Sequence, residues 1–144
     1  MSEADLTNIE TLRAVPMFAA LDDVALKHVV ELATPVELPA GHVLLNAGQE
    51  GSGMFVVLDG TVRVELAGGT EIDCSKGEFI GELSLLVDGL LHTCRARAAT
   101  PVQCLAISRN DFSRLLATYP QIAIAMLHVL ARRLADTDAL FRSR

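Results

Sequence analysis

A glycine, a carboxylate and a hydroxyl lie close together in an otherwise apolar stretch of the sequence. They are Gly81, Glu82 and Ser84, set among phenylalanine, isoleucine and leucine. A short helical turn that begins near Glu82 would leave its first backbone N–H groups without a partner, and such amides suit an anion, typically a phosphate. Glycine before the turn lets a ligand approach the backbone, and Glu82 can accept hydrogen bonds from sugar hydroxyls. This pattern favours a ligand that carries both a phosphate and a diol.

Glu82 has a second interpretation, because a carboxylate at the start of a turn can also cap that turn. Its neighbours Phe79, Ile80, Leu83 and Leu85 are all apolar, and an unpaired carboxylate buried among them would be very costly. The apolar surroundings therefore favour a ligand as its partner, and capping is the alternative.

The stretch that must position these residues has the pattern of short β-strands. From residue 34 to 107, short apolar segments are separated by glycine-containing turns, and Val62 and Val64 alternate with Thr61, Arg63 and Glu65. Such alternation predicts half-buried strands. We expect an eight-stranded antiparallel jelly roll or barrel over residues 34–107, because closure removes exposed sheet edges.

Helical patterns flank this β region on both sides, so the expected fold class is α+β, mainly β. Residues 5–33 are predicted to be helical, interrupted at Pro16, with Asp22 as an N-cap. Residues 108–141 are predicted to form two helices, with Ser108 as the N-cap of the first and Pro120 in the first turn of the second. The 144 residues are within the range of one domain, and we expect a single domain over residues 1–144.

The last helix carries an apolar seam whose spacing alternates between four and three residues. Such a seam is typical of two-helix pairing. Packing of the same face on the chain's own barrel is the alternative. We expect a homodimer through the C-terminal helix. The seam residues are Ala123, Leu127, Leu130, Leu134, Thr137 and Phe141.

Composition argues against several classes of protein. The net charge of −6 is unfavourable for direct contact with nucleic acid. The polar, acidic N-terminus and the lack of a long apolar run predict neither a signal peptide nor a membrane span. Three cysteines without C-x-x-C spacing and four scattered histidines predict buried free thiols in a reducing, cytoplasmic compartment and no metal site.

Several longer segments, taken together, resemble the cyclic nucleotide-binding domains, particularly the sensor domains of bacterial catabolite activators. The resemblance extends from about residue 12 to 140. It rests on VPMF-x-x-L (15–21), LPAGHVLLNAG (38–48), G-x-G-x-MFVVLDGTVRV (51–64), GEFIGELSL (77–85), ISRNDF-x-x-L-L (107–116) and ARRL (131–134). It implies a regulatory domain that binds cyclic AMP or a similar ligand and has no enzymatic activity or metal cofactor.

The resemblance also implies individual ligand contacts. Gly81 and the amides of Leu83 and Ser84 would line the phosphate, and Glu82 would hold the ribose 2′-hydroxyl. His92 stands at the position of the family's phosphate-binding arginine, Thr93 at the adjacent hydroxyl, and Thr137 where the activators place a threonine against the purine. In those proteins a helix-turn-helix module follows the long helix, whereas this sequence ends at Arg144, so we expect no DNA contact from this chain.

The histidine at position 92 keeps two functions open. Arginine has a permanently charged fork that suits phosphate, whereas histidine with an ordinary pKa near 6.5 is mostly neutral at pH 7. The chain is therefore either a cyclic nucleotide sensor that signals through its last helix, or a degenerate domain that binds no nucleotide and serves as a dimeric interaction module.

Overall fold

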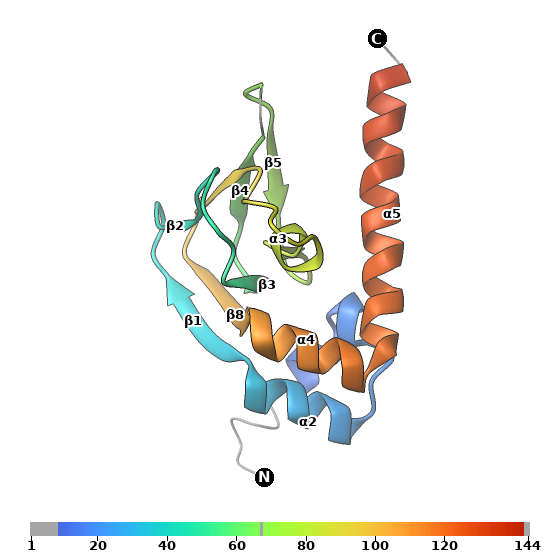
Figure 1. Cartoon of the computed structure of the whole chain (residues 1–144). Helices are drawn as coiled ribbons and strands as arrows, with labels where there is room; N and C mark the ends of the chain where they lie inside the picture. The colour runs from blue at the N-terminus through green and yellow to red at the C-terminus, as the bar shows by residue number, and fades with distance from the viewer. Residues whose placement is uncertain (1–8, 67, 143–144) are drawn as a thin grey trace.

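The structure is a computed structural model that describes residues 9–66 and 68–142, with side chains as far as Asp136. Within these residues, eight strands form two four-stranded antiparallel sheets, ordered β1-β8-β3-β6 and β2-β7-β4-β5. The two sheets face each other as an open, jelly-roll-like barrel (Figure 1). The strands are β1 (Thr34–Leu38), β2 (Val43–Leu45), β3 (Gly53–Asp59), β4 (Val62–Glu65), β5 (Glu71–Cys74), β6 (Phe79–Ile80), β7 (Arg95–Ala98) and β8 (Val102–Ser108).

The first sheet is covered on both faces, which explains the continuous apolar run of β3. Met54 and Val56 pack in the cluster formed with the helices, whereas Val57 belongs to the cluster inside the barrel. Because successive side chains of a strand point to opposite faces, β3 contributes to two cores at once. The interior of the barrel is completed by Val62, Val64, Ala96 and Cys104, among others.

The second sheet buries only its inner face. On its outer face Arg63 pairs with Asp73 at 3.1 Å, and Arg97 pairs with Glu65 at 3.1 Å. The predicted alternation of residues 61–65 is confirmed, because Val62 and Val64 are buried between these charged positions.

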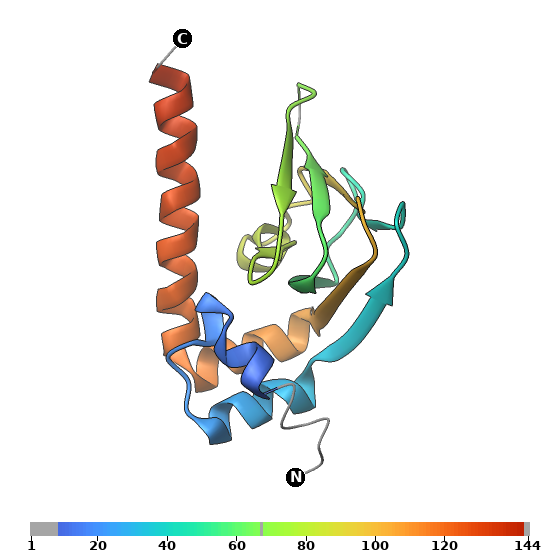
Figure 2. The ribbon, with the colours of Figure 1, turned by 180° about the vertical axis from the view of Figure 1, so that it is seen from behind.

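Helices pack below and beside the barrel (Figures 1 and 2). They are the 3₁₀ helix η1 (Pro16–Phe18), α2 (Asp23–Leu32), α3 (Leu83–Leu86), α4 (Arg109–Thr118) and α5 (Pro120–Arg142). The predicted N-caps are confirmed: the Asp22 carboxylate accepts from the Ala25 amide and the Ser108 hydroxyl from the Asp111 amide. Pro120 begins α5, as predicted.

The predicted interruption of the helical region 5–33 at Pro16 is confirmed. Residues 9–13 are helical, but the chain then turns and forms only the short η1 before α2, which ends at Leu32. Proline fixes φ and donates no hydrogen bond, so Pro16 begins a new element rather than continuing the first. Met17 and Phe18 are buried. This packing secures the turn, and residues 1–8 lie outside the described part.

α5 is the longest helix and stands beside the barrel. Ile122 and Met126 in its first half are buried in the helical core cluster, whereas Leu127 and Leu134 are 63% and 65% exposed. Among the described residues no single helix is long and apolar enough to cross a membrane. α4 and α5 reach that length and apolarity only as a pair, across a bend of 108°.

Candidate functional site

The predicted ligand-binding turn, residues 81–86, follows β6, an edge strand of the first sheet, and contains α3. β6 pairs with β3 through Phe55 and Ile80, and this pairing fixes where the turn begins. Gly81 has φ of +89°, a backbone conformation that side chains with a Cβ rarely adopt. Leu83 and Ser84 are the first two residues of α3, so no carbonyl of their own helix can accept from their amides.

Glu82 is buried in this turn and is held by an arginine from α5. Its exposed fraction is 4%. Arg133 Nη1 donates to Glu82 Oε1 at 2.8 Å, and Arg133 Nη2 donates to the Phe79 carbonyl at 2.8 Å. The guanidinium carbon also lies 4.8 Å from the centre of the Phe79 ring. The first contact ties the 81–86 turn to the last helix, and the other two tie β6 to the same helix.

The charge state of Glu82 reflects two opposing influences. Burial raises its pKa above the ordinary value, whereas a backbone hydrogen bond and then Arg133 lower it. Burial is the largest of these effects, so the pKa is raised overall. The carboxylate therefore depends on a cationic or hydrogen-bonding partner to stay ionised in this place.

Ser84 and His92 meet on either side of Gly51. A Cβ added to Gly51 would lie 1.8 Å from Ser84 Oγ, 2.7 Å from Ser84 Cβ and 3.1 Å from His92 Cε1. The Ser84 hydroxyl itself donates to the Gly81 carbonyl at 3.1 Å. Close packing of the 49–52 loop on the turn therefore needs glycine at position 51.

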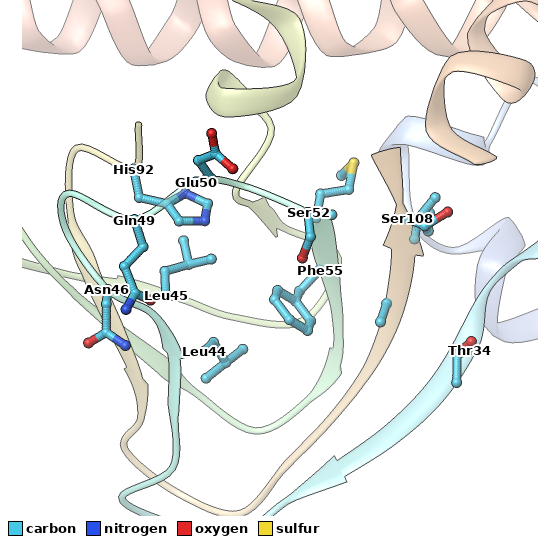
Figure 3. Close-up of a pocket in the computed structure, with 14 residues that line it drawn as sticks. Thr34, Leu44, Leu45, Asn46, Gln49, Glu50, Ser52, Phe55, His92 and Ser108 are labelled. Carbon is cyan, nitrogen blue, oxygen red and sulfur yellow. The ribbon is translucent and has the colours of Figure 1, made fainter. Parts of the chain in front are cut away.

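His92 is attached to the same loop by its backbone. Its N–H donates to the Gln49 carbonyl and its carbonyl accepts from the Gly48 amide, both at 2.9 Å. The imidazole lines a cavity of about 450 Å³ beside Gln49 and Glu50, with Phe55 among the other lining residues (Figure 3). Burial lowers its pKa, which disfavours the charged imidazolium.

The structure gives less information on Thr93 and Thr137, the two remaining predicted ligand contacts. Thr93 is exposed, and the side chain of Thr137 lies outside the described residues. Cys94 is half-buried, unlike the fully buried Cys74 and Cys104, and all three thiols are free. Burial and then the charge of Glu82 raise the pKa of Cys94.

Arg95 and Arg97 do not substitute for a phosphate-binding arginine at position 92. Both pair with Glu65, at 3.5 Å and 3.1 Å. Their strand register places them on the outer face, where solvent screens them, as the alternation of residues 94–98 predicts.

The sequence alone does not indicate the contacts that Arg133 and Gly51 make in the site. Arg133 lies in the A-R-R-L run, and Gly51 begins a segment that supported the family resemblance. Neither sequence pattern predicts the contact, because the partners are far apart in the chain: Arg133 and Glu82 are separated by 51 residues. Within the part of the chain described, no group of three or more His, Cys, Asp or Glu residues is placed to hold a metal ion.

Comparisons with known proteins agree with this architecture. A family model described as "Cyclic nucleotide-binding domain" matches residues 35–119, more than half of the chain. The catabolite activator protein of Thermus thermophilus has a similar structure, with a TM-score of 0.78 and 28% identity over 88% of this chain and 62% of that one.

Two curated relatives show the range of proteins that contain such a domain. A cyclic nucleotide-gated potassium channel of Mesorhizobium japonicum is 33% identical over 92% of this chain and 37% of its own length. A CRP-like cAMP-activated global transcriptional regulator of Mycobacterium tuberculosis is 27% identical over 90% of this chain and 59% of its own. This chain thus spans only part of the length of these relatives. Because the family model matches more than half of its residues, the chain belongs to the cyclic nucleotide-binding domain family.

Proposed function

We propose that the chain is a regulatory, non-catalytic domain that binds a cyclic nucleotide, preferentially cyclic AMP. The observation that carries this proposal is the buried Glu82 carboxylate, 4% exposed, beside the two open amides of Leu83 and Ser84. A ribose diol can donate to the carboxylate while a cyclic phosphate accepts from the amides. Gly81, His92, Thr93 and Thr137 would complete the contacts.

The signal would leave the site through α5. Arg133 is bound to Glu82 and to the Phe79 carbonyl, so a ligand hydroxyl that bonds to Glu82 must share or replace the arginine. Because a ligand shifts a conformational equilibrium only by its differential affinity for the two states, this contact gives it a direct means to change the position of α5.

A second function is favoured by the same residues. His92 has a pKa lowered by burial and lines the cavity with Gln49 and Glu50, and Glu82 already has a cationic partner. A domain in which these internal contacts are permanent would bind no nucleotide and would act as a dimeric protein-interaction module.

Calorimetric titration with cyclic AMP and cyclic GMP distinguishes the two functions. The sensor should release or absorb heat and show a raised melting temperature, and Glu82→Gln should weaken binding by about tenfold or more. Glu78→Gln is the matched control, because Glu78 is exposed and accepts from the Ser75 amide outside the turn. Absence of heat and of thermal shift at millimolar ligand would favour the interaction module.

If His92 contacts the phosphate, affinity should depend on pH. The free imidazole has a pKa lowered by burial, and an adjacent phosphate would raise it in the complex. Affinity should then be highest below the free pKa and should fall as pH rises through the bound pKa. His92→Arg should bind about tenfold more tightly or better and lose this dependence. A flat titration series between about pH 5.5 and 8 would contradict a role for His92 at the phosphate.

We also propose that two copies pair through α5. Leu127 and Leu134 lie one heptad apart and are 63% and 65% exposed, and Ile124 is 56% exposed beside them. Replacing Leu127 and Leu134 by serine should convert a dimer to a monomer in sedimentation equilibrium. Val24→Ser is the control, because Val24 is even more exposed, at 77%, but lies on α2. A wild-type monomer at all concentrations would contradict the pairing.

The net charge and the free thiols of the chain bear on its partners and on its cellular compartment. A net charge of −6 disfavours DNA as the partner of this chain. Free thiols with pKa values raised by burial, to about 12 for Cys74 and about 11 for Cys104, suit a reducing compartment. We therefore place the domain in the cytoplasm.

A further inference from the structure

Arg109, the first residue of α4, reaches across to two backbone carbonyls from different parts of the site. Its Nη2 donates to the Gly51 carbonyl at 2.6 Å and to the Ser84 carbonyl at 2.9 Å. Its backbone N–H donates to the Ser52 carbonyl at 2.8 Å. One residue therefore joins the 49–52 loop, the 81–86 turn and the start of α4.

The carbonyl of Ser84 needs such a donor. α3 has only four residues, and the last carbonyls of a helix have no partner within it. The Val87 amide, which could close the turn onto Ser84, donates to the Leu83 carbonyl instead. Ser84 is 2% exposed, so water has little access, and a buried carbonyl without a donor is costly.

We propose that Arg109 is a positioning residue that holds the 81–86 turn against the 49–52 loop and couples both to α4. The effect of Arg109 on ligand binding rests on the proposed function, because the turn that Arg109 positions carries the amides of Leu83 and Ser84. Its positioning role is independent of any ligand. The two hydrogens of one terminal nitrogen serve two carbonyls, a geometry that a lysine ammonium reproduces less well.

The contacts of Arg109 connect the site mechanically to α4, and through α4 to the bend before α5. α4 extends from Arg109 to Thr118 and is followed at once by α5. A displacement of the Ser84 carbonyl on ligand binding would act directly on the first residue of α4. This connection is separate from the Arg133 contact, which reaches α5 without α4.

Amide hydrogen exchange of the unliganded protein tests the proposal. Arg109→Gln should accelerate exchange in residues 81–87 and 49–52 by about tenfold, while the amides of β4 keep their wild-type rates. Arg109→Lys should give an intermediate acceleration. Arg114→Gln is the matched control, because Arg114 lies on the same helix, is 72% exposed and is 4.0 Å from its nearest acidic partner, Asp111; it should change nothing.

Binding measurements on the same variants separate this inference from the proposed function. Where wild type binds cyclic AMP, Arg109→Gln should weaken binding about tenfold. If wild type binds neither nucleotide, the proposed function fails, and exchange still decides the role of Arg109. Wild-type exchange rates in residues 81–87 of Arg109→Gln would overturn the inference. If the glutamine variant does not fold, the lysine variant decides: wild-type rates overturn the proposal and accelerated rates confined to the two segments support it.

Discussion

Gly51→Ala is expected to lower the free energy of unfolding by about 1–3 kcal/mol and to displace the 81–86 turn. The added methyl group would lie 1.8 Å from Ser84 Oγ and 2.7 Å from Ser84 Cβ. Rotation of the hydroxyl can relieve the first contact but not the second, so the loop or the turn must move. Because the open amides of Leu83 and Ser84 belong to this turn, cyclic AMP affinity should fall by about tenfold or more. Denaturant unfolding and calorimetry measure the two effects.

A double-mutant cycle with Ser84→Gly identifies the contact that causes the loss. Glycine at position 84 removes both clashing atoms, so Gly51→Ala should cost less in the Ser84→Gly background than in wild type. The expected interaction is about 1 kcal/mol or more in favour of the double variant. Strictly additive effects would contradict the proposed packing of the 49–52 loop on the turn.

Local sequence patterns predicted those parts of the fold that depend on local interactions. The N-caps Asp22 and Ser108 lie where a short polar side chain precedes a helix, and each accepts from the amide three residues later. The strands with alternating or continuous apolar residues are present, because burial of one or both faces is directly visible in the residue order.

One strand was missed because it is too short to show a sequence pattern. The two-residue strand β6, Phe79–Ile80, is too short to show a period, and only its pairing with β3 defines it. The break at Pro16, by contrast, was predicted, and the helix before it does not continue into α2. Burial of Met17 and Phe18 beneath the helices stabilises the intervening turn, and tertiary packing of this kind overrides propensity.

The candidate site was predictable as a set of residue types but not as a set of contacts. The apolar surroundings of Glu82 indicated that it needs a partner, and the structure supplies Arg133 from 51 residues away. Similarly, nothing local marks Arg109 as a donor to Gly51 and Ser84, 58 and 25 residues distant. Contacts of such separation depend on how the sheets and α5 pack, which spacing within one segment does not specify.

Arg133→Gln is expected to destabilise the protein by about 2 kcal/mol at pH 7.5. The change leaves the buried Glu82 carboxylate without its cation, and breaking a fully buried pair costs about 3–5 kcal/mol. The smaller figure follows because the Arg133 side chain is 38% exposed, so water screens part of the interaction. Arg132→Gln is the matched control. Arg132 is the neighbour of Arg133 on α5 and is exposed, and a surface substitution of this kind changes stability by no more than about 0.5 kcal/mol.

The pH dependence of that loss tests its electrostatic origin. Burial raises the pKa of Glu82 and Arg133 lowers it, so the pKa should rise further in Arg133→Gln. A carboxyl group with a raised folded pKa holds its proton more tightly in the folded than in the unfolded state, and ionisation above that pKa costs stability. The difference in unfolding free energy between wild type and Arg133→Gln should therefore shrink as pH falls from 7.5 to 5. In the Glu82→Gln background, which has no charge to leave unpaired, Arg133→Gln should cost less and show no such trend. A loss of equal size at every pH, in both backgrounds, would show that contacts of Arg133 other than its ion pair with Glu82, such as those with Phe79, hold α5 to the barrel.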